Sequence, residues 1–356
     1  MSSILKDIKA KIVSRYEDYL TTFIEIAASA ILGFSVGAII LYALGYDAGV
    51  AYSILFTRGL SNANYLLSKA TPIMLTGLAF AIPMIAGVFN IGGESQLYVG
   101  AITSLVIAVY TGNPLLAIAA GIAAGAGLGG LIAVLKVYRG VNEVIAAIMF
   151  NWIFYYTILY LLTDKLYNPQ IPHESLPVPP SARIGVIPTP WGEIRAIFFI
   201  AVLASLLVYY ILHYTSTGYT MRVSGLSPRS AKYAGFNPER SIINSMLLGG
   251  GCAGLGGSLL VLGYMFSLDT TMSSLYGLGF TGIGVALLGR NNPIGIIFSA
   301  IFFSMLIIGG EMMELKVGTP TELADTLIGV IVIALALPYA YRMLISYIKT
   351  RRLIKK

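Results

Sequence analysis

The 356-residue chain has little charge: only 11% of its residues are Asp, Glu, Lys or Arg, and 57% are hydrophobic. Soluble domains carry about 25% charged residues, so the composition excludes an ordinary water-soluble globule. Long apolar stretches recur between residues 22 and 344, and several approach the roughly 20 residues that a helix needs to span a bilayer. The alternating segments of about 10 residues typical of a membrane β-barrel are absent. We therefore expect an all-α integral membrane protein.

Residues that carry metal or catalytic chemistry are also scarce. The single cysteine, Cys252, excludes an internal disulfide, and His173 and His213 form no paired metal-binding motif. No glycine is followed by lysine, so the G-x-x-x-x-G-K-[ST] nucleotide motif is missing. An intramembrane enzyme would need a nucleophile–base pair, and none stands out. The sequence thus predicts no metal site, no cofactor and no enzymatic activity, and any ATP must be bound by another chain.

The distribution of positive charge predicts the topology. With a cytosolic N-terminus and ten crossings, 17 of the 23 Lys and Arg residues fall on the inside, as the positive-inside rule requires. The basic residues behind the net charge of +7 therefore lie in short loops beside the membrane, and the charge does not indicate nucleic-acid binding. Both termini are predicted to be cytosolic. The ten apolar segments are 22–45, 71–89, 97–111, 114–135, 143–163, 195–213, 241–264, 277–289, 293–310 and 325–342.

The predicted organisation is one polytopic transmembrane domain, 22–344, between a cytosolic amphipathic lead-in, 1–21, and a basic cytosolic tail, 345–356. The lead-in has no apolar core followed by a cleavage site, so we do not interpret it as a signal peptide. The segment 277–289 is short, and it either spans the membrane or re-enters it. About ten transmembrane helices are expected in all.

Two loops are long enough to carry function. The outer loop 164–194 has seven prolines and no helical period, which predicts an extended cap. The inner loop 214–240 contains a short predicted helix, PRSAKYA, with Ser227 as N-cap, Pro228 at the first position and Gly235 as a left-handed terminator. A two-turn helix is marginal alone, so we expect it to pack on a partner. A solvated loop with a turn is the alternative.

The stretch GGGCAG at 249–254 matches a dinucleotide-binding fingerprint, but that motif needs a preceding strand. It lies within an apolar run, where small residues at G-x-x-x-G spacing favour close helix packing. Similar spacing occurs at Gly121, Gly125 and Gly129. We therefore interpret these glycines as a helix-packing surface.

Polar residues interrupt two apolar stretches, GVFNIGGESQLYVGA at 87–101 and VNEVIAAIMFNWIF at 141–154. An acidic residue at the bilayer centre costs roughly 3 kcal/mol, so such groups usually face a bundle interior or a wet cavity. Paired glycines would break the first helix, and a broken backbone is tolerated only where it lines protein or water. We predict that the polar side chains line a substrate pathway. They are Asn90, Glu94, Gln96, Glu143 and Asn151.

Glu94 has a second interpretation. It precedes Leu97 by three residues, where a carboxylate would cap the helix expected at 97–111. The sequence leaves the capping role and the pathway role open.

Four motifs occur in the order typical of a known family: FNIGGESQLYVGA, NEVIAAIMFNWI, TGYTMRVSGLSPRSAKYAGF and GFTGIGVALLGRNNPIG. Together, over roughly residues 60–340, they resemble the membrane-spanning permeases of ABC importers, in the branch for nucleosides and simple sugars. The long outer loop is similar to that of the larger of two paired permeases. Ser95, Ser227 and Ser230 stand where the family usually has Gly, Asn and Ala, which bears on the identity of the substrate.

The resemblance implies a plasma-membrane complex: a second, smaller permease, an ABC ATP-binding subunit and an extracytoplasmic substrate-binding lipoprotein. It also implies that 214–240 is the coupling loop that docks on the ATPase, with the loop Arg290–Pro293 on the same side. The residues of the coupling loop that match the family pattern are Gly218, Arg222, Gly225, Pro228, Ala231, Tyr233, Ala234 and Gly235.

We therefore expect a permease subunit that moves a nucleoside or simple sugar by alternating access. The neutral side-chain amides of Asn90, Gln96 and Asn151 are suited to hydrogen bonds with hydroxyl groups and base edges. The alternative is an ion-coupled secondary transporter with Glu94 or Glu143 as proton carrier. A capped cytosolic helix argues against it, since a transporter acting alone has less need of one.

Overall fold

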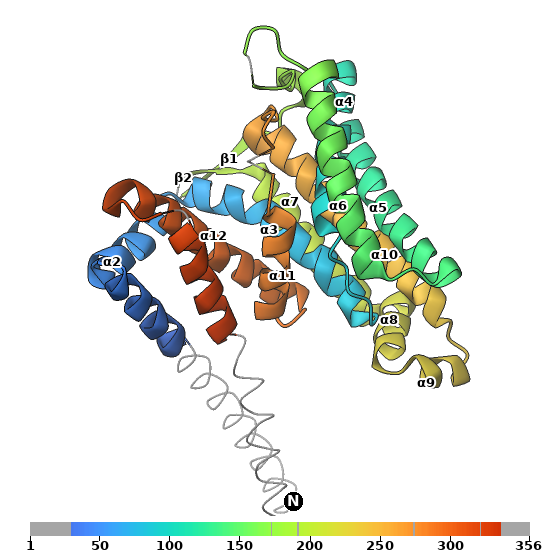
Figure 1. Cartoon of the computed structure of the whole chain (residues 1–356). Helices are drawn as coiled ribbons and strands as arrows, with labels where there is room; N and C mark the ends of the chain where they lie inside the picture. The colour runs from blue at the N-terminus through green and yellow to red at the C-terminus, as the bar shows by residue number, and fades with distance from the viewer. Residues whose placement is uncertain (1–29, 172, 191, 273–274, 321, 336–356) are drawn as a thin grey trace, which may run out of the picture. The chain divides into compact units, whose positions relative to one another are not determined.

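The computed structural model describes residues 30–335, except 172, 191, 273–274 and 321. The predicted lead-in 1–21 and tail 345–356 lie outside the described residues. The described part is almost entirely helical (Figure 1) and divides into two compact units, one formed by the residues up to Arg58 and from Leu306 onward, the other by Gly59–Met305.

The first unit contains the helix Ala30–Ala43, α2 (Ala48–Gly59), the end of α12 (Pro293–Val317) and the helical residues 322–335. The rings of Phe34 and Tyr52 meet edge to face at 5.4 Å, and the Tyr52 hydroxyl donates to the Phe34 carbonyl at 2.7 Å. The sequence did not predict α2. Its start is local, because the Asp47 carboxylate accepts from the Gly49 and Val50 N–H groups.

The second unit holds most of the helices and a single described β-hairpin. Its elements are α3 (Ala63–Ile85), α4 (Gly93–Thr111), α5 (Pro114–Arg139), α6 (Glu143–Tyr160) with its π-helical end η1 (Leu161–Lys165), η2 (Pro180–Ala182), β1 (Val186–Thr189), β2 (Gly192–Arg195), α7 (Ala196–Tyr214), α8 (Ser216–Leu226), α9 (Pro228–Tyr233), α10 (Pro238–Leu260) with η3 (Val261–Met265), α11 (Leu278–Leu288) and the start of α12.

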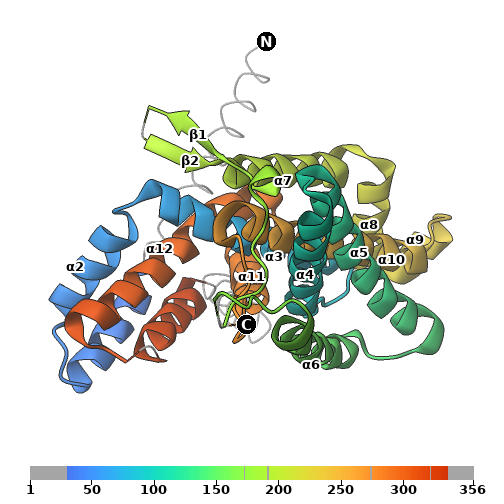
Figure 2. The ribbon, with the colours of Figure 1, turned by 90° about the horizontal axis from the view of Figure 1, so that it is seen from above.

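Helix α10 is the centre of this unit and packs against α3, α4 and α5, which lie beside it in both views (Figures 1 and 2). A side chain at Gly254 or Gly125 would collide with the facing backbone, so glycine permits the close approach. The predicted helix-packing role of the glycine-rich stretch is confirmed.

Asparagine begins five of the long helices. Each asparagine side chain accepts from an N–H group in the first turn of its helix: Asn62 in α3, Asn113 in α5, Asn142 in α6, Asn237 in α10 and Asn292 in α12. Proline follows directly at the start of α5, α10 and α12, where an N–H group would have no partner within the helix. These local signals fix the helix starts.

Six described helices are long and apolar enough to cross a membrane: Ala63–Ile85, Pro114–Arg139, Glu143–Lys165, Ala196–Tyr214, Pro238–Met265 and Pro293–Val317. The all-α membrane class is therefore confirmed, whereas about ten crossings and cytosolic termini stay predictions. Helix α11 has only 11 residues, fewer than the roughly 20 needed to span alone. The helix expected at 97–111 begins at Gly93, so Glu94 lies inside it.

The loops 164–194 and 214–240 differ in secondary structure. The loop 164–194 is mostly non-helical, and its end folds into the antiparallel hairpin of β1 and β2. The loop 214–240 contains the predicted helix as α9, where Ser227 Oγ accepts from the Ser230 N–H at 3.3 Å and Gly235 has φ +84°. It also contains α8, which the sequence analysis did not predict because its residues are largely polar.

Candidate functional site

The polar residues of 87–101 stabilise a buried break between α3 and α4. Asn90 donates from Nδ2 to the Ala79 carbonyl at 2.9 Å, and its Oδ1 accepts from the Gly92 N–H at 3.1 Å. Its amide also exchanges hydrogen bonds with the amide of Gln96, at 3.0 and 3.2 Å. Because both side chains are buried, these bonds replace those that a continuous helix would have made.

Asn151 supports the same break from α6. Its Oδ1 accepts from the Ser95 N–H at 3.0 Å, and its Nδ2 donates to the Ile91 carbonyl at 3.2 Å. The side chain thus supplies a donor and an acceptor to the two sides of the paired glycines. The structure brings Asn90, Gln96 and Asn151 together around one turn, and that they line a substrate pathway stays a prediction.

Glu94 caps a helix, although a different one from the helix that the sequence suggested. Its carboxylate accepts from the N–H groups of Gly277 at 2.6 Å, Gly279 at 2.5 Å and Phe280 at 3.2 Å, which form the start of α11. The hydroxyl of Tyr98 donates to it at 2.5 Å. The N-cap residue Gly277 has no side chain, so a carboxylate 183 residues away serves in its place.

Glu94 and Asn151 also line a cavity of about 120 Å³ whose walls are mostly aromatic. Tyr155 is central to it, with ring centroids 5.9 Å from Trp152, 6.0 Å from Tyr276 and 6.3 Å from Tyr98. The complete lining is Glu94, Tyr98, Ile148, Asn151, Trp152, Tyr155, Tyr276 and Phe280. We call this space the aromatic cavity.

The sequence analysis missed the aromatic residues of this cavity. Ile148, Asn151, Trp152 and Tyr155 are spaced so that they lie on one face of α6, a signal that was present in the sequence. Tyr276 comes from a distant segment, and no local pattern links it to α6.

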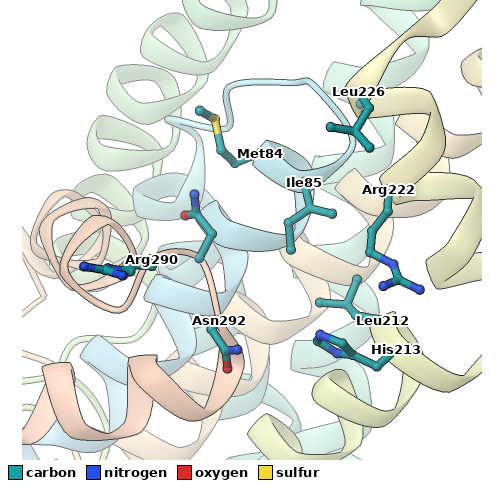
Figure 3. A pocket seen from close by; sticks show the side chains of 10 residues that line it. Met84, Ile85, Leu212, His213, Arg222, Leu226, Arg290 and Asn292 are labelled. Carbon is teal, nitrogen blue, oxygen red and sulfur yellow. The ribbon is translucent and has the colours of Figure 1, made fainter. Parts of the chain in front are cut away.

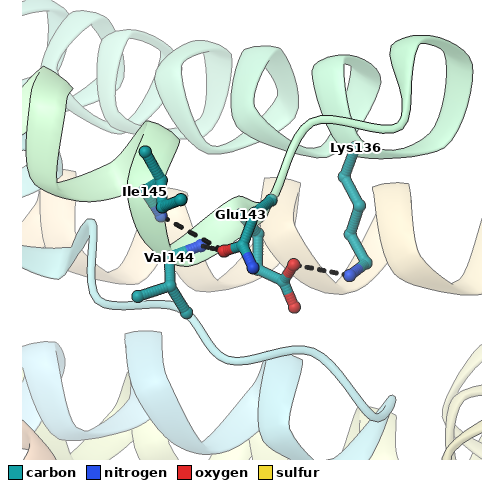
Figure 4. Close-up of polar contacts among 5 residues, drawn as sticks. Lys136, Glu143, Val144 and Ile145 are labelled. Carbon is teal, nitrogen blue, oxygen red and sulfur yellow. Dashed lines mark hydrogen bonds and ion pairs between the residues drawn. The ribbon is translucent and has the colours of Figure 1, made fainter.

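Glu143 lies apart from the aromatic cavity. Its carboxylate pairs with the Lys136 ammonium at 2.6 Å and so joins the end of α5 to the start of α6 (Figure 4). The neighbouring Asn142 side chain accepts from the N–H groups of Val144 and Ile145. The contacts of Glu143 therefore connect two helix ends.

The loop 214–240 forms a protruding helical corner in which α8 meets α9 (Figure 1). Two large side chains stand out from it: Leu226 is 87% exposed and Tyr233 is 94% exposed. Exposed apolar groups of this size, surrounded by polar residues, are typical of a protein interaction surface.

The family-pattern residues of this loop, apart from the half-buried Arg222, fall into two groups. Gly218, Gly225 and Ala231 pack within the chain: a side chain at Gly218 would meet α7, one at Gly225 would meet the Ile85 carbonyl, and Ala231 is fully buried. The resemblance implies that Ala231 is part of the loop that docks on the ATPase, and the structure buries its side chain within the chain. Exposed residues of the pattern are Pro228, Tyr233, Ala234 and Gly235.

The described helices of membrane-spanning length define an integral membrane protein that has a buried polar break beside an aromatic cavity and a protruding helical corner. The chain matches the family of permease components of branched-chain amino acid transport systems over residues 62–336, and it belongs to that family. It is a permease subunit of the ABC type, a multi-pass protein of the plasma membrane, and it lacks an ATP site of its own.

Curated relatives cover nearly the whole chain. The guanosine ABC transporter permease protein NupP of Bacillus subtilis (strain 168) is 32% identical over 90% of this chain and 95% of its own. The nucleoside ABC transporter permease protein NupB of Lactococcus lactis subsp. cremoris (strain MG1363) is 31% identical over 90% and 92%. The glucose ABC transporter permease protein TsgB13 of Haloferax volcanii is 30% identical over 85% and 83%.

The first two relatives belong to transport systems with a second permease, NupQ and NupC, which the chain matches more weakly. The chain matches NupP and NupB better than it matches NupQ and NupC, and its kinship to the larger of two paired permeases stays a prediction. No solved structure matches the chain.

Proposed function

We propose that this permease imports a nucleoside, and that the aromatic cavity is one wall of its pathway. The observation that carries the proposal is the placement of a carboxylate and an amide, Glu94 and Asn151, among aromatic rings. Aromatic side chains stack on nucleobases, with about 1–3 kcal/mol per base, and polar groups at the edge of such a site fix orientation. The relatives named for guanosine and nucleosides support this assignment.

A simple sugar is the second candidate substrate, and one relative is named for glucose. Sugar rings also pack on aromatic faces, so the cavity alone does not choose between the two. Uptake measurements with both substrates distinguish them.

The aromatic cavity is too small to hold a nucleoside alone. Its volume of about 120 Å³ lies below the roughly 300–1,000 Å³ typical of ligand sites. We infer that the second, smaller permease closes the other side of the pathway. The paired relatives support this arrangement.

Transport is driven, in this proposal, by an ABC ATP-binding subunit that docks on the α8–α9 corner. Leu226 and Tyr233 are the exposed apolar contacts, and the glycines packed beneath transmit movement of the corner to α3 and α7. A substrate-binding lipoprotein delivers the nucleoside from outside. Alternation between inward-facing and outward-facing states follows ATP binding and hydrolysis.

Uptake of labelled guanosine, glucose and leucine by cells that express the complete transport system tests the substrate. We expect guanosine uptake, and a loss of about tenfold in Trp152→Ala, because removal of one stacking ring costs about 1–3 kcal/mol. Tyr110→Ala, an exposed aromatic outside the cavity, is the matched control. Uptake of leucine alone would refute the nucleoside assignment, and glucose uptake alone would favour the sugar.

A further inference from the structure

A second pocket, of about 460 Å³, lies where four segments of the Gly59–Met305 unit meet. It is bounded by the ends of α3 and α7, by α8 and by the turn between α11 and α12 (Figure 3), all of which the topology prediction places on the cytosolic side. Its lining is Met84, Ile85, Leu212, His213, Arg222, Gly225, Leu226, Arg290, Asn291 and Asn292. We call it the arginine pocket.

The arginine pocket is basic and has unmet hydrogen-bonding capacity. No aspartate or glutamate lines it, and neither Arg222 nor Arg290 pairs with an acidic residue in the described part of the chain. Among the described residues, Arg222 Nε and Asn291 Oδ1 are buried atoms without a hydrogen-bond partner. Unpaired buried atoms of this kind are costly, so the pocket offers hydrogen-bonding groups to a polar ligand.

The turn between α11 and α12 is held in an uncommon backbone conformation. Arg290 and Asn291 have φ values of +54° and +53°, in the left-handed region that non-glycine residues rarely adopt. Local strain of this kind is concentrated at binding and switch sites. It presents Arg290, Asn291 and Asn292 together at one wall of the pocket.

We propose that the arginine pocket receives an acidic side chain of the ABC ATP-binding subunit. This inference rests on the proposed docking of that subunit at the α8–α9 corner, and it adds a second contact beside it. Two features favour a protein over an anionic lipid. The orphan atoms are one donor and one acceptor, and a peptide segment supplies both, whereas a phosphate offers acceptors only. Met84, Ile85 and Leu226 fit the methylene groups of a glutamate.

The second contact involves elements other than α9. Arg222 belongs to α8, Arg290 to the α11–α12 turn, and Ile85 to the end of α3. An acidic group seated between them would hold these three elements at one point. The ATP-binding subunit would thereby act on the helices beside the aromatic cavity directly, as well as through α9.

Photo-crosslinking in the assembled transporter tests the occupant. Benzoylphenylalanine in place of His213, which lines the pocket from the end of α7 and lies outside the α8–α9 corner, should crosslink to a peptide of the ATP-binding subunit that contains Asp or Glu, identified by mass spectrometry. The same group in place of Tyr138, an exposed residue at the end of α5 outside the pocket, is the control. A phospholipid adduct, or no adduct of the ATP-binding subunit, would overturn the proposal.

Charge reversal supplies an independent readout. Arg222→Glu and Arg290→Glu should each weaken binding of the ATP-binding subunit to the permease pair by about tenfold or more, and Arg290→Lys should change it by less than about threefold. Only variants whose thermal unfolding matches the wild type are compared. Unchanged affinity in both reversals would overturn the pocket contact.

A crosslinker in place of Tyr233 separates this inference from the proposed function. A crosslink at Tyr233 without one at His213 would refute the arginine pocket and leave docking at the corner intact. No crosslink at either position would refute docking itself.

Discussion

At the residue scale, Glu94 joins two helices that are distant in the sequence. Its carboxylate satisfies three N–H groups at the start of α11 while its own backbone begins α4. A side chain at Gly279 would collide with Glu94, so the two chain segments are in close contact. The short helix α11 therefore depends on a residue outside itself for its starting turn.

We predict that Glu94→Gln lowers the free energy of unfolding by about 1.5–3 kcal/mol. Glutamine retains one acceptor, and its NH₂ group faces N–H groups that it cannot satisfy. Thermal unfolding of the purified protein in detergent measures the effect. Glu193→Gln, on the exposed hairpin, is the control and should change little. Equal stability of the wild type and Glu94→Gln would show that α11 does not need this cap.

At the element scale, α5 and α10 approach each other through glycines. Gly125 faces the backbone of Gly250 and Gly254, whereas a Cβ atom added to Gly127, two residues further along α5, would meet nothing within 4 Å. The two positions share a helix and differ in what they face. They separate the effect of close packing from that of helix propensity.

We predict opposite effects for the two alanine substitutions. Gly125→Ala should destabilise the protein by about 1–3 kcal/mol, because the methyl group forces the helices apart. Gly127→Ala should leave stability unchanged or raise it by up to about 1 kcal/mol, because alanine favours the helix. Thermal unfolding in detergent measures both. A shift of the same sign in both variants would contradict the packing explanation.

Helix α9 ends at a residue whose backbone conformation favours glycine. Gly235 has φ +84°, and a β-branched residue there would strain the turn by about 1–2 kcal/mol. We predict that Gly235→Val raises the number of ATP molecules hydrolysed per substrate carried in the reconstituted transporter. Gly235→Asn, which tolerates the left-handed region, should remain near wild-type coupling. Wild-type coupling in Gly235→Val would refute a coupling role for this helix end.

At the scale of the whole molecule, the open question is which energy source drives transport: ATP hydrolysis by a partner subunit or an ion gradient. The family assignment places the chain in the ATP-driven class, and Glu94 and Glu143, the two candidate proton carriers, are occupied in structural contacts. We predict that collapse of the proton gradient leaves uptake unchanged when ATP is maintained. Loss of uptake under that condition would favour the ion-coupled alternative.

The sequence predicted what local residue order determines. Ser227, Pro228 and Gly235 mark both ends of α9 within nine residues, and the helix is there. The partner of Glu94 and the position of Tyr276 could not be predicted, because they depend on contacts between segments more than 100 residues apart. Helix α8 was missed since it is polar and shows no apolar period, and it is held by packing on α7.

The contact between Glu94 and α11 has an electrostatic consequence for the solute that passes. The start of a helix carries roughly half a positive elementary charge, and here it faces a carboxylate at hydrogen-bond distance. The helix terminus offsets only about half of the charge of an ionised carboxylate, so about half a negative elementary charge is left at the wall of the aromatic cavity. In the proposed pathway, an anion would lose its hydration there without gaining a counter-charge, whereas a neutral molecule would lose much less.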